Sequence, residues 1–598
     1  MSAKNDLDKP LSEEQKLHNM RHSCSHILAQ AVLEMFPDAK LGIGPTIETG
    51  FYYDFDLPRT LIPEDLKILE DKMKRIIKEK QTFHRVEEPA AEAVEFLEGK
   101  GQPYKAEVVR DLMEEGEEIV SFYENKDRKD NLKFWDLCEG GHLENTGQVG
   151  AFKLTKIAGA YWRGDEKRPM LQRIYGACFL TKEELKAYLD QLEEAKKRDH
   201  KVLGPKLGLY TSSPLVGAGL PLLGPKGAVI RRELEDYLWE LHKNRGYSRV
   251  YSPHIAKEDL YVQSGHAAKF GDELFRVKGK EDSFILKPMN CPHHMQIFSD
   301  NQFSYRDMPV RYFEPAVVYR DEKSGQLGGL TRVRSITQDD GHLFCRVSQI
   351  KAEVKIVCEV INEFYSTIGM NEDYWVSLSV RGEERDKYLG DDKIWEQAEE
   401  ALEEAAKAIK LPYKRVEGEA AFYGPKLDFM FKDAIGREWQ LATIQCDFNL
   451  PLRFELEFTN EEGEKERPVV IHRAICGSFE RFMGVLIEHF VGAFPVWLAP
   501  VQVQIIPVAT PHHDFANKYA QKLRSEGARV IVDDSNDSLG KRIRNAEMQK
   551  IPYMLVVGDK EIDGDNIAVR SYKTKEQFDV GKNEFIDQLK ADIKERKL

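Results

Sequence analysis

The chain has 598 residues, which is too long for a single hydrophobic core and predicts about three or four domains. Its formal net charge of −14 argues against a protein that coats nucleic acid non-specifically, although local basic patches still allow a nucleic-acid partner. The polar N-terminus lacks the apolar core of a signal peptide, and no apolar run is long enough to cross a bilayer. We therefore expect a cytoplasmic protein without membrane contact.

The eight cysteines are dispersed along the chain, and none belongs to a CxxC pair. In a reducing compartment, such cysteines favour core positions or metal ligation over disulfide bonds. Cys138 in WDLCEGGHL and Cys291 in KPMNCPHH lie close to histidines and are candidate metal ligands.

The first part of the chain combines a long helix with candidate metal ligands. We expect a disordered tail over residues 1–16, followed directly by a helix on which His22 and His26 lie one turn apart. The later run WDLCEGGHL adds a cysteine and a histidine, and these residue types bind zinc. A metalloprotease helix would need Glu directly after its first histidine, where this chain has Ser23. The alternative is that these histidines are ordinary surface or core residues.

Residues 181–202 have the charge pattern of an exposed amphipathic helix and predict a linker to a second, larger part. In that part, a Cys/His/His set with an open fourth position would be typical of a working zinc site. The residues able to contribute are Cys291, His293, His294, His342 and His472. They lie far apart in the sequence, so only the fold could bring three of them together.

The stretch from Arg311 to Cys345 predicts a hairpin of two strands around the glycine-rich turn GQLGG. Arg320, Arg332 and Arg334 lie near the ends of these strands. Planar, permanently charged guanidinium groups suit phosphate oxygens. The alternative is a surface hairpin with solvated charges.

Further elements follow in chain order. Residues 351–415 are helical and acidic and predict an insertion or packing layer. The runs GEAAFYGPKLDF and REWQLATIQCDF predict strands, and HRAICGSFERFMGVLIEHF predicts a helix with an apolar face. From Val501 onward, short apolar runs alternate with helical segments at the spacing of βαβ units. The helix LGKRIRNAEMQK in this part is basic, so we expect either a solvated face or a contact with an RNA backbone.

Several separated motifs occur in an order that resembles one family. They are RHSCSH, GFYYDFD, DLCEGGH, KPMNCP, YRDEKSG, TRVRSITQDD, AFYGPK, WQLATIQCDF and HRAICGSFERF. Over residues 17–598 the chain resembles the threonyl-tRNA synthetases, which are class II aminoacyl-tRNA synthetases. The resemblance implies an antiparallel-sheet catalytic core, an N-terminal α+β editing domain and a C-terminal α/β anticodon-binding domain. Their expected limits are residues 17–180 for editing, 181–202 for the linker helix, 203–500 for catalysis and 501–598 for the anticodon. Many bacterial members carry a further small N-terminal domain, which we expect this chain to lack.

The resemblance also implies an activity. Members attach L-threonine to tRNA(Thr) through threonyl-adenylate, using ATP with Mg²⁺, and they hydrolyse mischarged seryl-tRNA(Thr). One Zn²⁺ per subunit would bind the hydroxyl of threonine, because an apolar pocket rejects valine poorly. Serine also has a hydroxyl, so a second, hydrolytic site is needed. A homodimer is implied as well.

Residue roles follow from the motif matches alone. The implied zinc ligands are Cys291, His342 and His472. The implied catalytic residues are Arg320, Arg481 and Lys426. Contacts to ATP are implied for Arg320, Glu322, Arg332, Gln440, Ser478 and Arg481. Contacts to threonine are implied for Gln338, Asp340, Tyr423 and Lys426. The implied editing residues are His22, His26, Tyr53, Lys105, Asp136, Cys138 and His142. Anticodon contacts are implied for Asn536, Glu561 and Arg570.

Other functions remain open at this point. One is a synthetase-like RNA-binding or regulatory protein without catalysis, and another is a synthetase for proline or serine. The retained arginine pair and metal-ligand set favour an active enzyme for threonine. Binding to its own messenger RNA, known for some members, is less expected without the small N-terminal domain.

Overall fold

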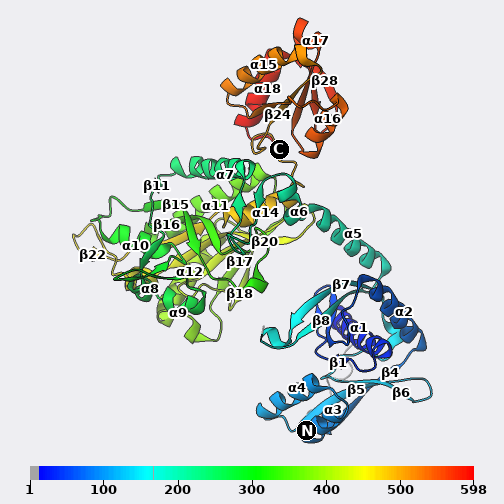
Figure 1. Ribbon diagram of the computed structural model, residues 1–598. Coiled ribbons are helices and arrows are strands. Elements are labelled where there is room, and N and C mark those ends of the chain that lie inside the picture. Colours follow the sequence, from blue (N-terminus) through cyan, green and yellow to red (C-terminus); the bar gives the residue numbers. More distant parts are fainter. Residues whose placement is uncertain (1–11, 166) are drawn as a thin grey trace. The chain divides into compact units, whose positions relative to one another are not determined.

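A computed structural model gives the structure of residues 12–165 and 167–598 (Figure 1). This part of the chain divides into two compact units, with the boundary between Glu193 and Glu194. None of the described helices has both the length and the apolar character that a membrane span requires. All eight cysteines lie in the described part and are free thiols, as the sequence predicts.

The first helix of the chain, α1 (Glu13–Met35), begins earlier than the sequence predicts. Its start is fixed by a capping box, in which the Gln15 N–H donates to Ser12 Oγ at 3.2 Å. The Ser12 N–H donates in return to Gln15 Oε1 at 3.0 Å. The expected tail over residues 1–16 is therefore wrong for its last residues, and residues 1–11 lie outside the described part.

The first unit contains two antiparallel sheets, and α1 packs against the larger one. The strands of the five-stranded sheet are β1 (Lys40–Leu41), β2 (Thr46–Ile47), β3 (Gly50–Asp56), β7 (Ala151–Tyr161) and β8 (Met170–Phe179). The three-stranded sheet consists of β4 (Thr82–Pro89), β5 (Ile119–Lys126) and β6 (Leu132–Leu137). The other helices of this unit are α2 (Pro63–Glu79), α3 (Ala90–Gly99) and α4 (Pro103–Glu114). Apolar side chains from α1, α2 and β3 form one buried core, so α1 is held rigidly where it carries His22 and His26.

The expected single linker helix over residues 181–202 is two helices. They are α5 (Lys182–Arg198) and α6 (His200–Lys206). Asp199 separates them, because its ψ of 115° is extended and its carboxylate accepts the Lys201 N–H at 2.8 Å. The chain therefore changes direction directly before His200.

The second unit is built on an eight-stranded, largely antiparallel sheet (Figure 1). In spatial order its strands are β11 (Ser248–Arg249), β15 (Val310–Tyr319), β16 (Ser335–Cys345), β23 (Val469–Ala474), β20 (Glu438–Asp447), β19 (Lys426–Lys432), β17 (Tyr374–Val380) and β18 (Tyr413–Glu417). The helices that share one buried core with one face of this sheet include α7 (Pro225–Lys243), α11 (Ile350–Ile368) and α14 (Phe479–His489). The opposite face meets α10 (Cys291–Ser299) in a separate apolar cluster. Nearby lie α8 (Glu258–Ser264), α9 (His266–Phe270), and the small sheet of β12 (Ile255–Lys257), β13 (Arg276–Lys278) and β14 (Ser283–Leu286).

The expectation for residues 351–415 is only partly correct. The segment contains α11 and a second helix, α12 (Asp392–Ala408), but it also contributes β17 and β18 to the main sheet. The sequence YWVSLSV of β17 is buried on both faces over most of its length. From Val376 to Val380 this sequence alternates apolar residues with serine at the period of a strand, so the signal was present in the sequence and was missed.

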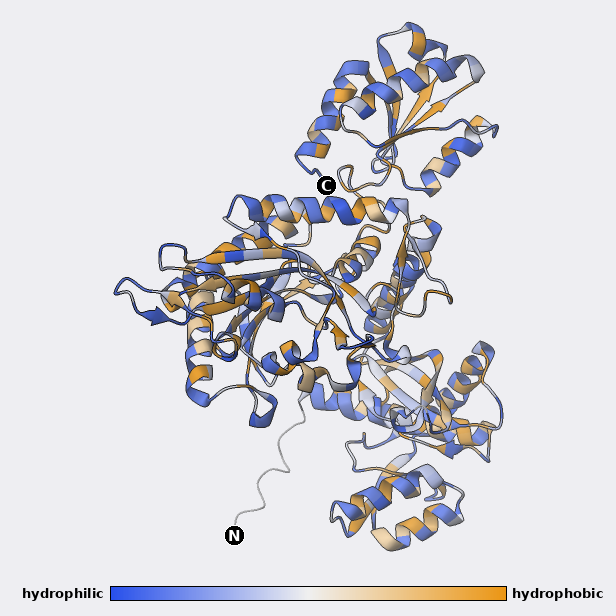
Figure 2. Ribbon diagram, turned by 60° about the vertical axis from the view of Figure 1, so that its left-hand side comes forward, coloured by the Kyte–Doolittle hydropathy of each residue, from blue (hydrophilic) through white to orange (hydrophobic). Residues whose placement is uncertain are grey.

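The C-terminal part forms a five-stranded sheet flanked by helices. Its strands in spatial order are β25 (Val530–Val532), β24 (Val503–Pro507), β26 (Tyr553–Val557), β27 (Asn566–Ser571) and β28 (Gln577–Gly581). The helices are α15 (His513–Ser525), α16 (Leu539–Met548), α17 (Asp559–Asp563) and α18 (Lys582–Lys594). Only the first three strands pair in parallel, so the βαβ pattern does not extend to the last two. Figure 2 shows this apolar sheet among helices with hydrophilic residues.

Candidate functional site

One face of the main sheet carries a line of polar and aromatic side chains. Residues directly opposite one another on neighbouring strands point to the same face. Such partners run from Tyr312 in β15 through His342, His472 and Gln445 to Lys426 in β19. We call these five residues the polar row. Adjacent positions along the same strands turn to the opposite face and enter the core beneath α7, α11 and α14.

The three predicted metal ligands meet at the polar row. Cys291 begins α10, whereas His342 and His472 face each other across β16 and β23. One ligand atom from each lies within 4.8 Å of the others, and all three side chains are buried. His472 Nε2 lies 2.8 Å from Asp447 Oδ2, which leaves Nδ1 as its remaining ring nitrogen. A buried set of one sulfur and two imidazoles fits Zn²⁺.

A buried hydrogen-bond chain fixes the ring of His342. Lys287 can only donate, so Asn290 turns Oδ1 toward it at 2.8 Å and donates Nδ2 to Glu314 at 3.0 Å. Burial raises the pKa of Glu314, but the hydrogen bond from His294 and the charge of Lys287 lower it to about 2. As a carboxylate, Glu314 only accepts, so His294 Nε2 donates to it at 3.0 Å. His294 Nδ1 then accepts from His342 Nδ1 at 2.8 Å.

This chain of hydrogen bonds leaves the lone pair of His342 Nε2 free. That nitrogen is buried and has no hydrogen-bond partner among the described residues. The hydrogen-bond directions therefore turn an acceptor atom toward Cys291 and His472, as a metal ligand requires. The implied ligand set did not include His294, and sequence reasoning missed Glu314. The adjacent histidines after Cys291 were the available signal.

The predicted threonine contacts lie around the same place. Gln338 and Asp340 alternate with His342 along β16 and so share its face, and Asp340 Oδ2 lies 3.7 Å from His342 Nδ1. The buried Tyr423 ring has its centroid 4.9 Å from that of His472, and its hydroxyl donates to Gln445. Burial raises the pKa of Tyr423, so this hydroxyl keeps its proton.

Lys426 ends the polar row and pairs with Asp428 at 2.7 Å. Sequence reasoning missed Gln445 and Asp447 in the neighbouring strand. They lie two residues apart in a strand that the sequence predicts, so they share a face, and this spacing was the signal.

Arg320 and Glu322 begin the loop that joins β15 to β16. The guanidinium of Arg320 lies 4.9 Å from the ring centroid of Phe270, and Nη2 lies 3.1 Å from Met289 Sδ. Burial lowers the pKa of Arg320, whereas Glu322 and a neighbouring glutamate raise it. The buried Glu322 accepts two hydrogen bonds from Arg332, at 2.9 and 2.6 Å. A guanidinium with few protein partners remains available to an anion, and Arg320 is such a group.

The remaining predicted ATP contacts lie at the start of α14 and on β20. Ser478 caps the helix by accepting the Arg481 N–H at 3.2 Å. The backbone of Ser478 also forms an isolated antiparallel β-bridge with Gln338 of the threonine set. The Arg481 guanidinium lies 5.8 Å from the ring centroid of Trp439, and burial lowers the pKa of Arg481. Gln440 follows Trp439 in β20 and is exposed. Ser478, Arg481 and Gln338 are thus brought together.

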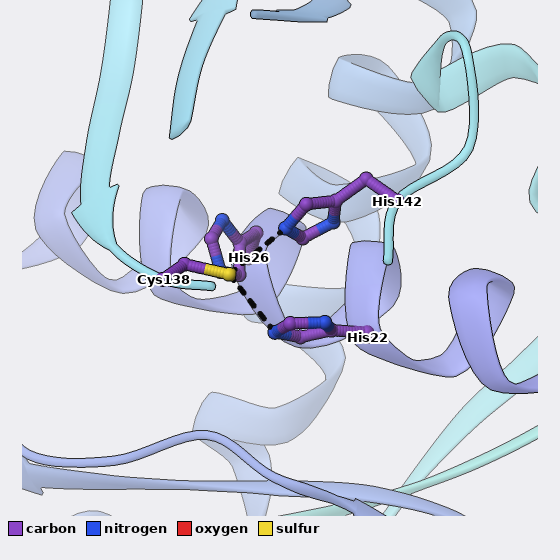
Figure 3. A group of neighbouring side chains, drawn as sticks. All are labelled: His22, His26, Cys138 and His142. Atoms are coloured by element: carbon purple, nitrogen blue, oxygen red, sulfur yellow. Dashed lines mark hydrogen bonds between the residues drawn. The ribbon is translucent and has the colours of Figure 1, made fainter. Parts of the chain in front are cut away.

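The first unit brings four of the seven predicted editing residues into one cluster (Figure 3). His22 and His26 project from α1, while Cys138 and His142 lie in the segment after β6. Figure 3 shows the Cys138 sulfur between two rings, 3.4 Å from His22 Nε2 and 3.3 Å from His142 Nε2. The rings of His22 and His142 stack with centroids 4.3 Å apart. Ser23, which sequence reasoning did not assign, lies with its hydroxyl 3.1 Å from His142 Nδ1.

Asp136 joins this cluster to the other predicted editing residues. Its two oxygens contact the Tyr53 hydroxyl at 2.5 Å and Lys105 Nζ at 2.7 Å. His26 Nε2 lies 3.8 Å from the same carboxylate. All seven predicted editing residues therefore lie in one connected site.

Burial sets the protonation of the editing cluster. It lowers the pKa of His22, and more strongly those of His26 and His142, so these imidazoles are neutral near pH 7. Burial and the charge of Asp136 raise the pKa of Cys138 to about 12, so its thiol keeps its proton. A strongly lowered pKa makes an imidazole a weak base, so His22, whose pKa is lowered least, is the best proton acceptor of the three.

The predicted anticodon residues are spread over the C-terminal part. Asn536 is exposed in the loop before α16. Glu561 accepts the Gly558 N–H at 2.8 Å and so caps α17. Arg570 in β27 pairs with Glu547 at 2.9 Å. The described residues show no hydrogen bond or ion pair among these three side chains, so their joint role in anticodon binding stays a prediction.

Family models match all three parts of the chain. Residues 275–490 match the tRNA synthetase class II core domain (G, H, P, S and T), and residues 502–592 match an anticodon binding domain. Residues 120–175 match the threonyl and alanyl tRNA synthetase second additional domain. Together with the antiparallel sheet, these matches define a class II aminoacyl-tRNA synthetase.

Curated relatives narrow the class to one family. The threonine–tRNA ligase of Gloeobacter violaceus is 49% identical over 94% of this chain and 89% of its own length. That of Clostridium tetani is 46% identical over 98% of this chain and 89% of its own length. The chain therefore belongs to the threonyl-tRNA synthetase family. Its activity is the attachment of threonine to tRNA with editing, and as a class II synthetase it uses ATP with Mg²⁺.

Solved structures agree with this membership. A Cryptosporidium parvum structure, titled as the RNA binding domain of threonyl-tRNA synthetase, has a TM-score of 0.63 and 35% identity, covering 66% of this chain and 98% of that chain. The putative threonyl-tRNA synthetase ThrRS-1 of Aeropyrum pernix has a TM-score of 0.59 and 32% identity, covering 67% of this chain and 95% of that chain.

Proposed function

We propose that the polar row and the residues around it activate L-threonine, and that the cluster on α1 edits seryl-tRNA(Thr). The observation that carries the first part is the convergence of Cys291, His342 and His472 with the predicted threonine contacts on one face of the main sheet. We assign editing to residues 17–180, linkage to residues 181–202, catalysis to residues 203–500 and anticodon binding to residues 501–598.

Cys291, His342 and His472 would hold one Zn²⁺ per subunit. Zinc held there would supply a Lewis acid able to recognise the amino and hydroxyl groups of threonine. Asp340 would accept a hydrogen bond from the same hydroxyl, and Gln338 and Tyr423 would complete the pocket. Valine has a methyl in place of this hydroxyl, so it would leave these polar groups unpaired.

Arg320 would bind the α-phosphate of ATP and stabilise the charge that develops as the threonine carboxylate attacks phosphorus. Arg481 would bind the γ-phosphate, and Lys426 would position the reacting carboxylate. Glu322, Arg332, Gln440 and Ser478 would line the nucleotide site. Positioning and charge stabilisation carry such a reaction, because no covalent intermediate with the protein is needed.

In the editing cluster, a neutral imidazole of the His22–His142 pair would orient water against the seryl ester and accept its proton. Lys105 and Tyr53, both held by Asp136, would bind the substrate. Support comes from the single connected site that these residues form.

Pyrophosphate exchange with threonine, serine and valine, measured with and without a zinc chelator, tests the synthetic site. We expect strong exchange with threonine that is lost on chelation and restored by added zinc. Exchange that survives complete zinc removal would separate the three ligands from threonine recognition. Tight tRNA binding without any exchange would instead support the regulatory alternative.

Hydrolysis of seryl-tRNA(Thr) by His22→Ala tests the editing site. We expect a loss of hydrolysis with unchanged threonine exchange. The exposed His84 in β4 provides a matched control, because His84→Ala removes an imidazole outside the cluster. Unchanged hydrolysis in His22→Ala would remove His22 from the mechanism.

We also propose a homodimer that binds tRNA(Thr) with Asn536, Glu561 and Arg570. Leu215 and Tyr251, in the chain segments before and after α7, are 99% and 74% exposed, and Tyr251 would be covered in such a dimer. Sedimentation of the wild type and Tyr251→Asp tests the dimer, since a shift of the variant toward monomer is expected.

A cytoplasmic location stays a prediction from the sequence, which cell fractionation tests.

A further inference from the structure

A buried histidine joins the linker to both predicted phosphate-binding elements of the second unit. His200 is the first residue of α6 and is 2% exposed. Its Nδ1 lies 2.6 Å from Oε1 of Glu488, which is also buried and belongs to the last turn of α14. The backbone N–H of His200 donates to the same oxygen at 3.1 Å. Neither His200 nor Glu488 is among the predicted site residues.

The loop between β15 and β16 contacts the opposite side of the His200 ring. The Leu330 N–H donates to His200 Nε2 at 3.0 Å. Because Nε2 accepts this bond, Nδ1 carries the ring proton and donates it to Glu488. Asp199, His200 and Glu488 could in geometry surround a metal ion, but both ring nitrogens are already used in hydrogen bonds.

Two glycines let the loop come this close. A Cβ on Gly329 would lie 2.3 Å from His200 Nε2, and Gly329 has a φ of +58°, which favours glycine. A Cβ on Gly484, in α14, would lie 3.4 Å from Leu330 Cβ and 3.6 Å from the His200 ring. Leu330 itself is fully buried. The loop therefore has one tightly defined position against α6 and α14.

The same loop carries the predicted nucleotide contacts. The Gly328 N–H donates to the Arg332 carbonyl at 3.1 Å, so the turn around Leu330 sets the backbone position of Arg332. On the other side of His200, Glu488 lies in the helix whose first turn contains Arg481. His200 thus connects two elements that would hold different phosphates of ATP.

We infer that His200 is a positioning residue for ATP, which sets the loop carrying Arg332 against the helix carrying Arg481. This inference rests on the proposed roles of Arg332 and Arg481 in nucleotide binding. His200 directly follows the break between α5 and α6. The linker that leaves the first unit therefore ends at a residue that contacts the nucleotide loop.

Three variants test this role. His200→Phe keeps an aromatic ring but removes both hydrogen bonds. His200→Gln keeps an acceptor for Leu330 and a donor for Glu488 within one side chain. Val202→Ala is the control, because Val202 lies in the same helix and is 61% exposed. The measurements are the KM values for ATP and threonine in pyrophosphate exchange, the active-site concentration, and the hydrolysis of seryl-tRNA(Thr).

We expect His200→Phe to raise the KM for ATP about tenfold, since the loss of a buried hydrogen bond has about this effect, and to change the KM for threonine less than about twofold. His200→Gln should recover most of the ATP affinity. Seryl-tRNA hydrolysis should stay at the wild-type value in all three variants.

The inference is overturned if His200→Phe binds ATP like the wild type, or if both KM values rise equally. It is also overturned if only the active-site concentration falls, because His200 would then support folding alone. Arg332→Ala tests the underlying assignment separately. An unchanged KM for ATP in Arg332→Ala would contradict the proposed nucleotide role of that arginine, while His200→Phe is still judged by its own KM.

Discussion

The imidazole rings of His294 and His342 meet at their Nδ1 atoms, 2.8 Å apart. Since Glu314 fixes His294 as the acceptor in this pair, His342 must donate from Nδ1 and present Nε2 to Cys291 and His472. The orientation of one proposed zinc ligand therefore depends on residues outside the ligand set. Partners of this kind raise metal affinity by holding a ligand in one tautomer.

The first prediction concerns zinc affinity. His294→Ala should lower it about 10- to 100-fold, because His342 loses the acceptor for its Nδ1 proton. Competition with a chelator, followed by measurement of bound zinc, gives the affinity without an activity assay. His293→Ala is the matched control, since His293 is also buried in α10 but has no hydrogen-bond partner for either ring nitrogen in the described structure. Equal zinc affinity in both variants would contradict the prediction.

The second prediction concerns the carboxylate at the centre of the editing site. Asp136→Asn should reduce seryl-tRNA hydrolysis about 100-fold, because Lys105 loses its charged partner and the Tyr53 hydroxyl loses a charged acceptor. Exchange with threonine should not change, since it depends on the second unit. Single-turnover deacylation of seryl-tRNA(Thr) measures the effect. Asp130→Asn is the control, because Asp130 is exposed and has a φ of 63°, which asparagine tolerates.

The third prediction concerns the pH dependence of stability. Burial raises the pKa of Asp339 to about 6, although Arg473 lowers it. Between about pH 3.8 and 6 the folded state therefore holds a proton that the unfolded state has lost, so this group stabilises the fold at low pH and the contribution disappears as the pH rises through 6. The total is about 3 kcal/mol.

Asp339→Asn should lack this dependence. The asparagine loses hydrogen bonds that Asp339 accepts from the Ile475 and Cys476 N–H groups, and this loss does not depend on pH. Because only the wild type loses stability as the pH rises, the variant should gain stability relative to it from pH 4.5 to pH 7. Thermal unfolding at several pH values measures the difference in Tm. A difference that is constant over this range would show that Asp339 does not titrate there.

The fourth prediction concerns a buried ion pair. Arg311 donates two hydrogen bonds to Glu353, at 2.6 and 2.7 Å, and Glu353 is 3% exposed. Glu353→Ala should destabilise the second unit by about 3–5 kcal/mol, because it leaves a poorly solvated guanidinium without its partner. Glu359→Ala, on the exposed face of the same helix, should cost less than about 1 kcal/mol. Denaturant unfolding of both variants gives the comparison.

The sequence was a good guide where a signal is local. The alternation around the turn after Tyr319 predicts β15 and β16, and the polar cap at Ser12 was present in the sequence although the predicted helix began later. β17 was missed although its residues Val376 to Val380 alternate apolar side chains with serine, because the helical, acidic pattern of the segments around it was extended across this short strand. Local patterns also did not show that Asp199 divides the linker into two helices.

The site required information that no local pattern contains. The residue types at Cys291, His342 and His472 suggested a metal site, but only strand register places His342 opposite His472. The contacts of His294 and His200 depend on side chains from distant segments, and neither contact has a fixed spacing in the sequence. The choice of these three ligands among five candidates came from the resemblance to a known family.

The order of the strands in space differs from their order in the chain, and this affects when the site can form during synthesis. β23 lies between β16 and β20, although both of those neighbours precede it in the sequence. A nascent chain still on the ribosome therefore lacks the central strand of its largest sheet until residue 474 has emerged. His472 belongs to that strand, so an incomplete chain has only two of its three proposed zinc ligands until this strand has joined the sheet.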